Sequence, residues 1–180
     1  LLSYSNLEIL HDEQWDLKQL LSKIQEKKNT LFSTSTKNSL VESHFALSKA
    51  KTAIETNDPF LSCWIKCAGI SLIDSILLQN QIIPNPTHSL SLLRNLKQEK
   101  INQFSEKIIS ETGIERAAPS LLTRMLKSSC GFSDMVENNQ NAKIIEKKAN
   151  HLIENSLLSD CYLYLTYQTK NNFYKIKNSL

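Results

Sequence analysis

The chain has 180 residues, of which 41% are hydrophobic, and this is enough for one domain with a substantial core. Only three glycines and four prolines are present, too few for a sheet protein with many tight turns, so the composition predicts an all-α fold of long helices. The formal net charge of +3 argues against the strongly basic surface of most nucleic-acid-binding domains.

The first predicted helix covers about residues 12–28, where leucine and isoleucine recur at helical spacing and the charges complement the helix dipole. Residues 29–38 are rich in serine, threonine and asparagine, which bond their own backbone outside helices, so a polar loop or hinge is expected. The sequence begins with leucine and shows no signal-peptide pattern. We therefore expect residues 1–38 to continue from a missing upstream domain, and residues 39–180 to form a helical domain.

A second helix is predicted over about residues 39–55. Leu40, Leu47 and Ile54 stand at heptad spacing, and we expect them on an apolar face. Small residues in the same helix should let a neighbouring helix approach closely: Ala46, Ala50 and Ala53.

The third predicted helix, residues 58–81, is apolar nearly all round. Asp58 is expected as its N-cap and Pro59 at its first position. Lys66 and Asp74 lie inside it, and each would cost ~2.5–3.5 kcal/mol at the centre of a bilayer. We therefore predict the central helix of a bundle rather than a membrane span, with partners for both charges on other helices and at least one charge partly buried.

Two prolines stiffen the connector at residues 82–86. A fourth helix is expected from Thr87 or His88 to Gly113, with a break at the charged run 97–100.

The C-terminal part predicts two further helices. The shorter begins at Pro119 and is closed by Gly131, and a polar loop over residues 133–141 follows it. The longer covers about residues 141–167. The basic and aromatic tail after Lys170 is expected to fray unless it docks on something.

Few residues suggest chemistry. Glycine-rich phosphate loops are excluded, and the acidic pair of a nucleotidyltransferase is absent, so no catalytic residue is assigned. Cys63 and Cys67 lie one helical turn apart and could share a soft metal with His88 or His151, but we expect them to be small core residues. No metal or cofactor is therefore expected. The four cysteines favour reduced thiols and a cytoplasmic protein.

Four charged or polar residues are candidates for substrate binding. Lys66 and Asp74 are the charges of the apolar third helix. His88 and Arg94 lie near the start of the fourth helix and could contact a phosphate, although solvent exposure alone would also explain them.

The pattern of small residues and leucines resembles that of a HEPN domain, and of the similar helical domains that follow minimal nucleotidyltransferases. The resemblance covers about residues 39–167, and its motifs are Leu47-Ser-Lys-Ala50, Ala53-Ile54, Ala68, Leu72-Ile73-Asp74-Ser-Ile-Leu77 and Pro84-Asn-Pro-Thr-His88-Ser-Leu90-Ser-Leu-Leu93. It implies an up-and-down bundle of about five to six helices. Arg94, Arg116 and Arg124 lack the His at the spacing of HEPN ribonucleases, so ribonuclease activity does not carry over.

The resemblance implies a helical C-terminal accessory domain of a nucleotidyltransferase-like protein, which contributes to a substrate or nucleotide cleft or to dimerisation. Its partner would be the upstream domain or a second copy, and a nucleotide could be bound between them. The alternative is a self-contained module for protein interaction or dimerisation, and a more remote one is a ribonuclease without the usual motif. We expect neither membrane nor nucleic-acid partners. Weak RNA affinity, if any, would reside in the tail with its three lysines and two aromatic residues.

Overall fold

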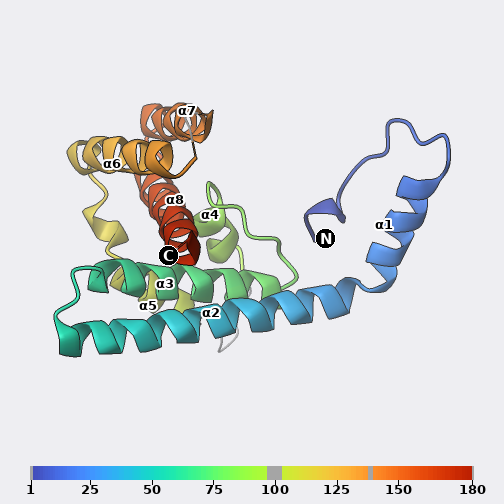
Figure 1. Cartoon of the computed structure of the whole chain (residues 1–180). Helices are drawn as coiled ribbons and strands as arrows, with labels where there is room; N and C mark the ends of the chain where they lie inside the picture. Colours follow the sequence, from blue (N-terminus) through green and yellow to red (C-terminus); the bar gives the residue numbers. More distant parts are fainter. Residues whose placement is uncertain (1, 97–102, 138–139, 180) are drawn as a thin grey trace.

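The computed structural model describes residues 2–96, 103–137 and 140–179. Within these ranges the chain is all-helical and has no strand, which confirms the predicted fold class (Figure 1). The described helices are more numerous than the five to six expected. They are the α-helices α1 (Asp16–Glu26), α2 (Lys28–Thr56), α3 (Leu61–Gln79), α4 (Ser89–Arg94), α5 (Gln103–Glu111), α6 (Pro119–Glu137), α7 (Gln140–Glu154) and α8 (Leu158–Ser179), and the short 3-10 helices η1 (Leu2–Tyr4) and η2 (Ile114–Arg116).

The long helices α2 and α3 form an antiparallel pair along one side of the molecule (Figure 1). At the other side α6, α7 and α8 pack together, and the C-terminal half of α8 descends onto α3. Helix α4 lies between α3 and α8, and α5 packs against α3. An N-terminal arm, which we define as residues 2–27, projects from the start of α2 away from the rest of the protein.

Small residues bring α2 and α3 close together. Ala46, Ala50 and Ala53 are buried at this contact, as their spacing predicted. The Ser43 hydroxyl donates a hydrogen bond of 2.9 Å to the backbone oxygen of Ala68 on α3. The alanine stripe therefore forms the main interface of α2.

The heptad residues of α2 lie beside this interface rather than in the core. Leu40, Leu47 and Ile54 are 45%, 47% and 61% exposed. They therefore do not pack in the core, because the alanines occupy the contact with α3 and the leucines lie at its flank.

Helix α2 also passes through the segment predicted as a loop. Phe32 and Thr36 are buried there, and the Thr36 hydroxyl donates to the Phe32 backbone oxygen at 2.9 Å. A hydroxyl bonded in this way to the carbonyl four residues earlier is compatible with a helix. The loop prediction for residues 29–38 is therefore wrong, and the boundary placed at residue 38 falls inside α2.

Helix α3 is the central helix, as predicted. Its length and composition would suffice to cross a membrane, but most of it is buried within the protein. The Asp58 carboxylate accepts a hydrogen bond from the Phe60 backbone N–H at 2.8 Å in the turn before the helix, but α3 begins at Leu61 with Phe60 as its N-cap, so the predicted start at Asp58 and Pro59 is wrong.

The next segment contains two separate helices, α4 and α5, and α4 ends at Arg94, before the charged run where a break is predicted. The charged run 97–100 lies outside the described residues. Gly113 follows α5 with a φ of 81°, which is the left-handed conformation expected at such a helix end. The Tyr162 hydroxyl donates to the neighbouring Thr112 oxygen at 2.9 Å and attaches this turn to α8.

The C-terminal helices differ from the prediction at two points. Helix α6 continues through Gly131 to Glu137, and Ser133 is buried in it, so the loop expected at residues 133–141 is wrong wherever that segment is described. The last predicted helix is divided into α7 and α8 at Ser156, which has a φ of 60°.

The tail after Lys170 docks rather than frays. Lys170 is 7% exposed and Phe173 is 5% exposed, because the end of α8 packs against α3. Neither side chain can therefore form the stacking and basic surface that a nucleic-acid-binding tail would need.

Candidate functional site

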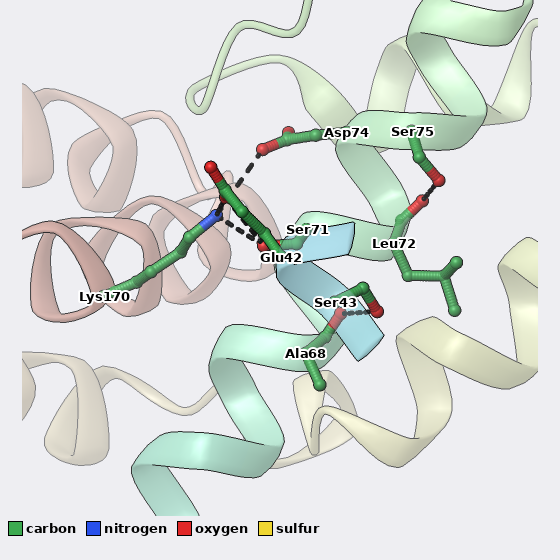
Figure 2. A network of polar contacts seen from close by, with 8 residues as sticks. All are labelled: Glu42, Ser43, Ala68, Ser71, Leu72, Asp74, Ser75 and Lys170. Atoms are coloured by element: carbon green, nitrogen blue, oxygen red, sulfur yellow. Dashed lines mark hydrogen bonds and ion pairs between the residues drawn. The ribbon is translucent and has the colours of Figure 1, made fainter. Parts of the chain in front are cut away.

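A buried cluster of charges joins α2, α3 and α8 (Figure 2). Lys170 extends from α8, and its Nζ donates to the Ser71 hydroxyl at 2.8 Å. The same Nζ lies 3.9 Å from Oδ2 of Asp74 and 3.7 Å from Oε2 of Glu42. One lysine is thus shared by two carboxylates, of which Asp74 is nearly buried and Glu42 is exposed.

Asp74 is the titratable group of this cluster that responds most to burial. Desolvation raises the pKa of its carboxyl to about 6, the positive charge of Lys170 partly opposes the increase, and Glu42 adds to it. The cluster therefore gains a proton under mildly acidic conditions. The cavity that Lys170 lines has a volume of only about 10 Å³, and the contacts of Lys170 connect α8 to α3 and α2.

Lys66 lies apart from this cluster. It is half-buried, and its Nζ is 5.6 Å from the centre of the Tyr162 ring on α8. The prediction that partners for Lys66 and Asp74 come from other helices is confirmed for both, as is the partial burial of at least one charge.

His88 and Arg94 form a second, separate group at α4. Both are exposed, and both act electrostatically on Asp160 near the start of α8. Desolvation raises the pKa of Asp160, while the charges of Arg94 and His88 oppose the increase. The four predicted site residues therefore do not meet in one site.

The cysteines behave as core thiols. Cys67 is 1% exposed, and burial raises the pKa of its thiol to about 11, so it stays protonated at neutral pH. Cys63 stands on the same helix and is half-buried, and both thiols are free. In the described ranges, no three His, Cys, Asp or Glu side chains come together as metal ligands would.

The main open site is an apolar groove between α2, α3 and α5, with a volume of about 610 Å³. We call it the α2–α3–α5 groove. Its floor consists of small residues, including Ala68 and Gly69 of α3. Larger apolar side chains form its walls: Leu40, Leu47, Ile65, Leu72, Phe104 and Ile108.

Gly69 allows α3 and the end of α5 to converge at this floor. A Cβ atom added there would lie 2.9 Å from Cγ2 of Thr112, closer than real contacts allow. The charged side chains that line the groove are Lys107 and Glu111, which lie one turn apart on α5. The groove therefore has an apolar centre and a charged rim.

Sequence reasoning missed this groove, although a signal for it was present. Helix α2 carries two stripes, one of alanines and one of leucines at heptad spacing. A helix needs only one stripe to pack on its neighbour in a hairpin, so the second stripe indicates a further partner.

A second unpartnered apolar surface lies on the N-terminal arm. Leu17 and Leu20 of α1 are 47% and 43% exposed. The arm is nevertheless held in a defined shape. The Asp12 carboxylate accepts from the Lys18 backbone N–H at 2.9 Å, and the Gln25 amide donates to the Ser5 oxygen at 2.9 Å.

The chain matches no family model, no curated protein and no solved structure. The resemblance to HEPN domains therefore stays a prediction.

Proposed function

We propose that this chain is a non-catalytic helical interaction domain that self-associates, with α1 of a second copy as the occupant of the α2–α3–α5 groove. The observation that carries the proposal is that one molecule presents both an open apolar groove and an exposed apolar helix. An apolar surface of this kind on a folded domain typically marks a binding site.

Helix α1 has the pattern that a groove of this type accepts. Leu17, Leu20 and Leu21 recur at i, i+3 and i+4, which is part of the anchor spacing of helices that bind in grooves, and Leu17 and Leu20 are exposed, whereas Ile24 of the same stripe is already buried in its own molecule. Helix α1 also carries both signs of charge, Asp16 in its first turn and Lys23 in its last. These charges can pair with Lys107 and Glu111 at the rim of the groove.

The groove of the same molecule is too far away for α1 to fill it. Helix α1 has 11 residues and is about 16 Å long. Leu47 lies 19 positions beyond Lys28, or about 28 Å along α2. If α1 folded back at Lys27, it would reach only the end of the groove near Leu40. A second copy has no such limit, and reciprocal exchange of the arms closes a two-fold dimer.

The accessory-domain function implied by the HEPN resemblance remains a separate hypothesis, because no feature of the groove favours a nucleotidyltransferase partner. Nothing in the ion cluster or at α4 supplies a nucleotide cleft either.

Sedimentation equilibrium of the full chain tests the proposal. We expect a dimer at about 100 µM protein, which a dissociation constant in the micromolar range would give. Leu47→Glu in the groove and Leu20→Glu on the arm should each give monomers. Val41→Glu is the matched control: Val41 is 68% exposed on α2 but does not line the groove, so this variant should remain a dimer.

A mixture of the two monomeric variants adds a stricter test. L47E retains an intact arm and L20E an intact groove, so the mixture should form a heterodimer through one exchanged arm. A monomeric wild-type chain at this concentration, or equal loss of dimer in V41E and L47E, would overturn the proposal.

A further inference from the structure

A second cavity, of about 270 Å³, lies between α6, α7 and α8. We call it the α6–α8 cavity. In contrast to the apolar groove, its lining is mainly polar. The residues that determine its chemistry are two lysines and several amides: Lys148, Lys175, Asn141, Gln168, Asn171 and Asn172. Among the described residues that line it, none is acidic.

Asn172 has a hydrogen-bond donor without an acceptor. Its side chain is 4% exposed, and its Nδ2 atom is buried with no hydrogen-bond partner. Buried polar atoms are nearly always paired, and an unpaired one is costly, so this amide requires an explanation. Asn172 borders the α6–α8 cavity, so a rotation of its amide toward the cavity would bring this donor to the acceptor atoms of a ligand.

The charge of the lining restricts the ligand further. Lys148 and Lys175 both border the cavity and are exposed. Tyr164 also lines it, and burial raises the pKa of its hydroxyl to about 12, so that group is a neutral phenol at physiological pH. The cavity thus combines cationic and neutral donors with no described carboxylate to repel an anion.

We infer that the α6–α8 cavity binds a compact oxyanion group, a phosphate or a carboxylate, with Lys148 as its cationic partner and Asn172 as its buried donor. Charge-assisted hydrogen bonds to such oxygens are the strongest that these side chains can make. The volume leaves room for an oxyanion group and a few attached atoms but is below the range of larger cofactor sites. This inference is independent of self-association, because the cavity shares no lining residue with the groove.

Calorimetric titration of the full chain with inorganic phosphate and with succinate, at constant ionic strength, tests the inference. We expect saturable binding of at least one of the two anions, and the comparison shows whether phosphate or carboxylate is preferred. Lys148→Gln should weaken this binding about tenfold, the usual effect of removing one charged hydrogen-bond donor.

Lys147→Gln provides the matched control. Lys147 is the neighbouring lysine on α7, is exposed and does not line the cavity, so the variant should bind as the wild type does. Asn172→Leu removes the buried donor and should also weaken anion binding. If the Asn172→Leu variant does not fold, K148Q alone still tests the inference. Absence of saturable binding of either anion up to about 50 mM, a range weaker than millimolar affinity, would overturn the inference. An equal loss of anion affinity in K147Q and K148Q would also overturn the inference.

Discussion

At the scale of single residues, the clearest result is the pairing of Asp74 with Lys170. The apolar run around Asp74 was sufficient to predict that this carboxylate needs a partner on another helix. The sequence pattern could not identify Lys170 as that partner, because Lys170 lies at the start of a polar tail that was expected to fray. The pairing depends on α8 continuing past Gln168, a tertiary effect that local sequence does not encode.

The raised pKa of Asp74 makes stability depend on pH. Its pKa is about 6 in the folded protein against 3.8 ordinarily, so the folded state holds more protons between these values. The contribution of Asp74 to stability is therefore largest below pH 4 and is lost as the pH rises through 6. The difference corresponds to at most about 3 kcal/mol of unfolding free energy.

Asp74→Asn should remove this dependence. We expect the variant to be as stable as the wild type or more stable at pH 7, and to lose that advantage at pH 4.5. Urea unfolding of both proteins at both pH values measures the difference in their unfolding free energies. The other carboxylates contribute equally to the two proteins, so this difference isolates the effect of Asp74. A constant difference between the two proteins across this range would refute the assignment of the raised pKa to Asp74.

At the scale of secondary-structure elements, periodicity predicted which segments are helical better than where they end. The start of α6 at Pro119 agrees with the prediction because Pro is favoured at the first helical position, whereas α3 begins at Leu61, later than the predicted start at Asp58 and Pro59. The break at Ser156 has no glycine or proline to indicate it. The continuity of α2 was missed because residues such as Thr36 bond within the helix, and burial of Phe32 favours that arrangement.

The assignment of the two stripes on α2 leads to a stability prediction. Ala46 is fully buried against α3, and its replacement by leucine should overpack the contact and cost about 1–3 kcal/mol. Leu47→Ala, one position further, removes a side chain that is 47% exposed and should cost much less than the ~2–5 kcal/mol of a buried leucine. Urea midpoints of both variants, measured below the concentration at which dimers form, provide the comparison. A larger loss of unfolding free energy for L47A than for A46L would show that the heptad residues, and not the alanines, pack in the core.

At the scale of the whole molecule, an aromatic cluster connects the end of the chain to its centre. The Trp64 ring of α3 lies 4.7 Å from the Phe173 ring of α8 and 6.1 Å from the Phe45 ring of α2, both edge to face. This cluster and the Lys170 contacts are the means by which α8 closes the molecule. Composition predicted an all-helical domain, but the groove and the α6–α8 cavity depend on how α5 and α8 pack and could not be predicted from single segments.

The final prediction is that the last turns of α8 are required for the fold. Phe173 is 5% exposed and contacts Trp64 as well as Phe60, whose ring is 5.8 Å away. Phe173→Ala should therefore cost about 3–5 kcal/mol, the usual range for a buried phenylalanine. Phe104→Ala is the control, since Phe104 is 61% exposed on α5, and it should cost less than about 1 kcal/mol when both variants are measured below the concentration at which dimers form, because Phe104 lines the α2–α3–α5 groove. Thermal unfolding followed by tryptophan fluorescence reports on the environment of Trp64, which is 4% exposed, together with that of Trp15, which is 60% exposed on the N-terminal arm and changes little on unfolding. If F173A melts at the same temperature as F104A, the end of α8 does not dock on α3, and the burial of Lys170 beside Asp74 would have to be abandoned with it.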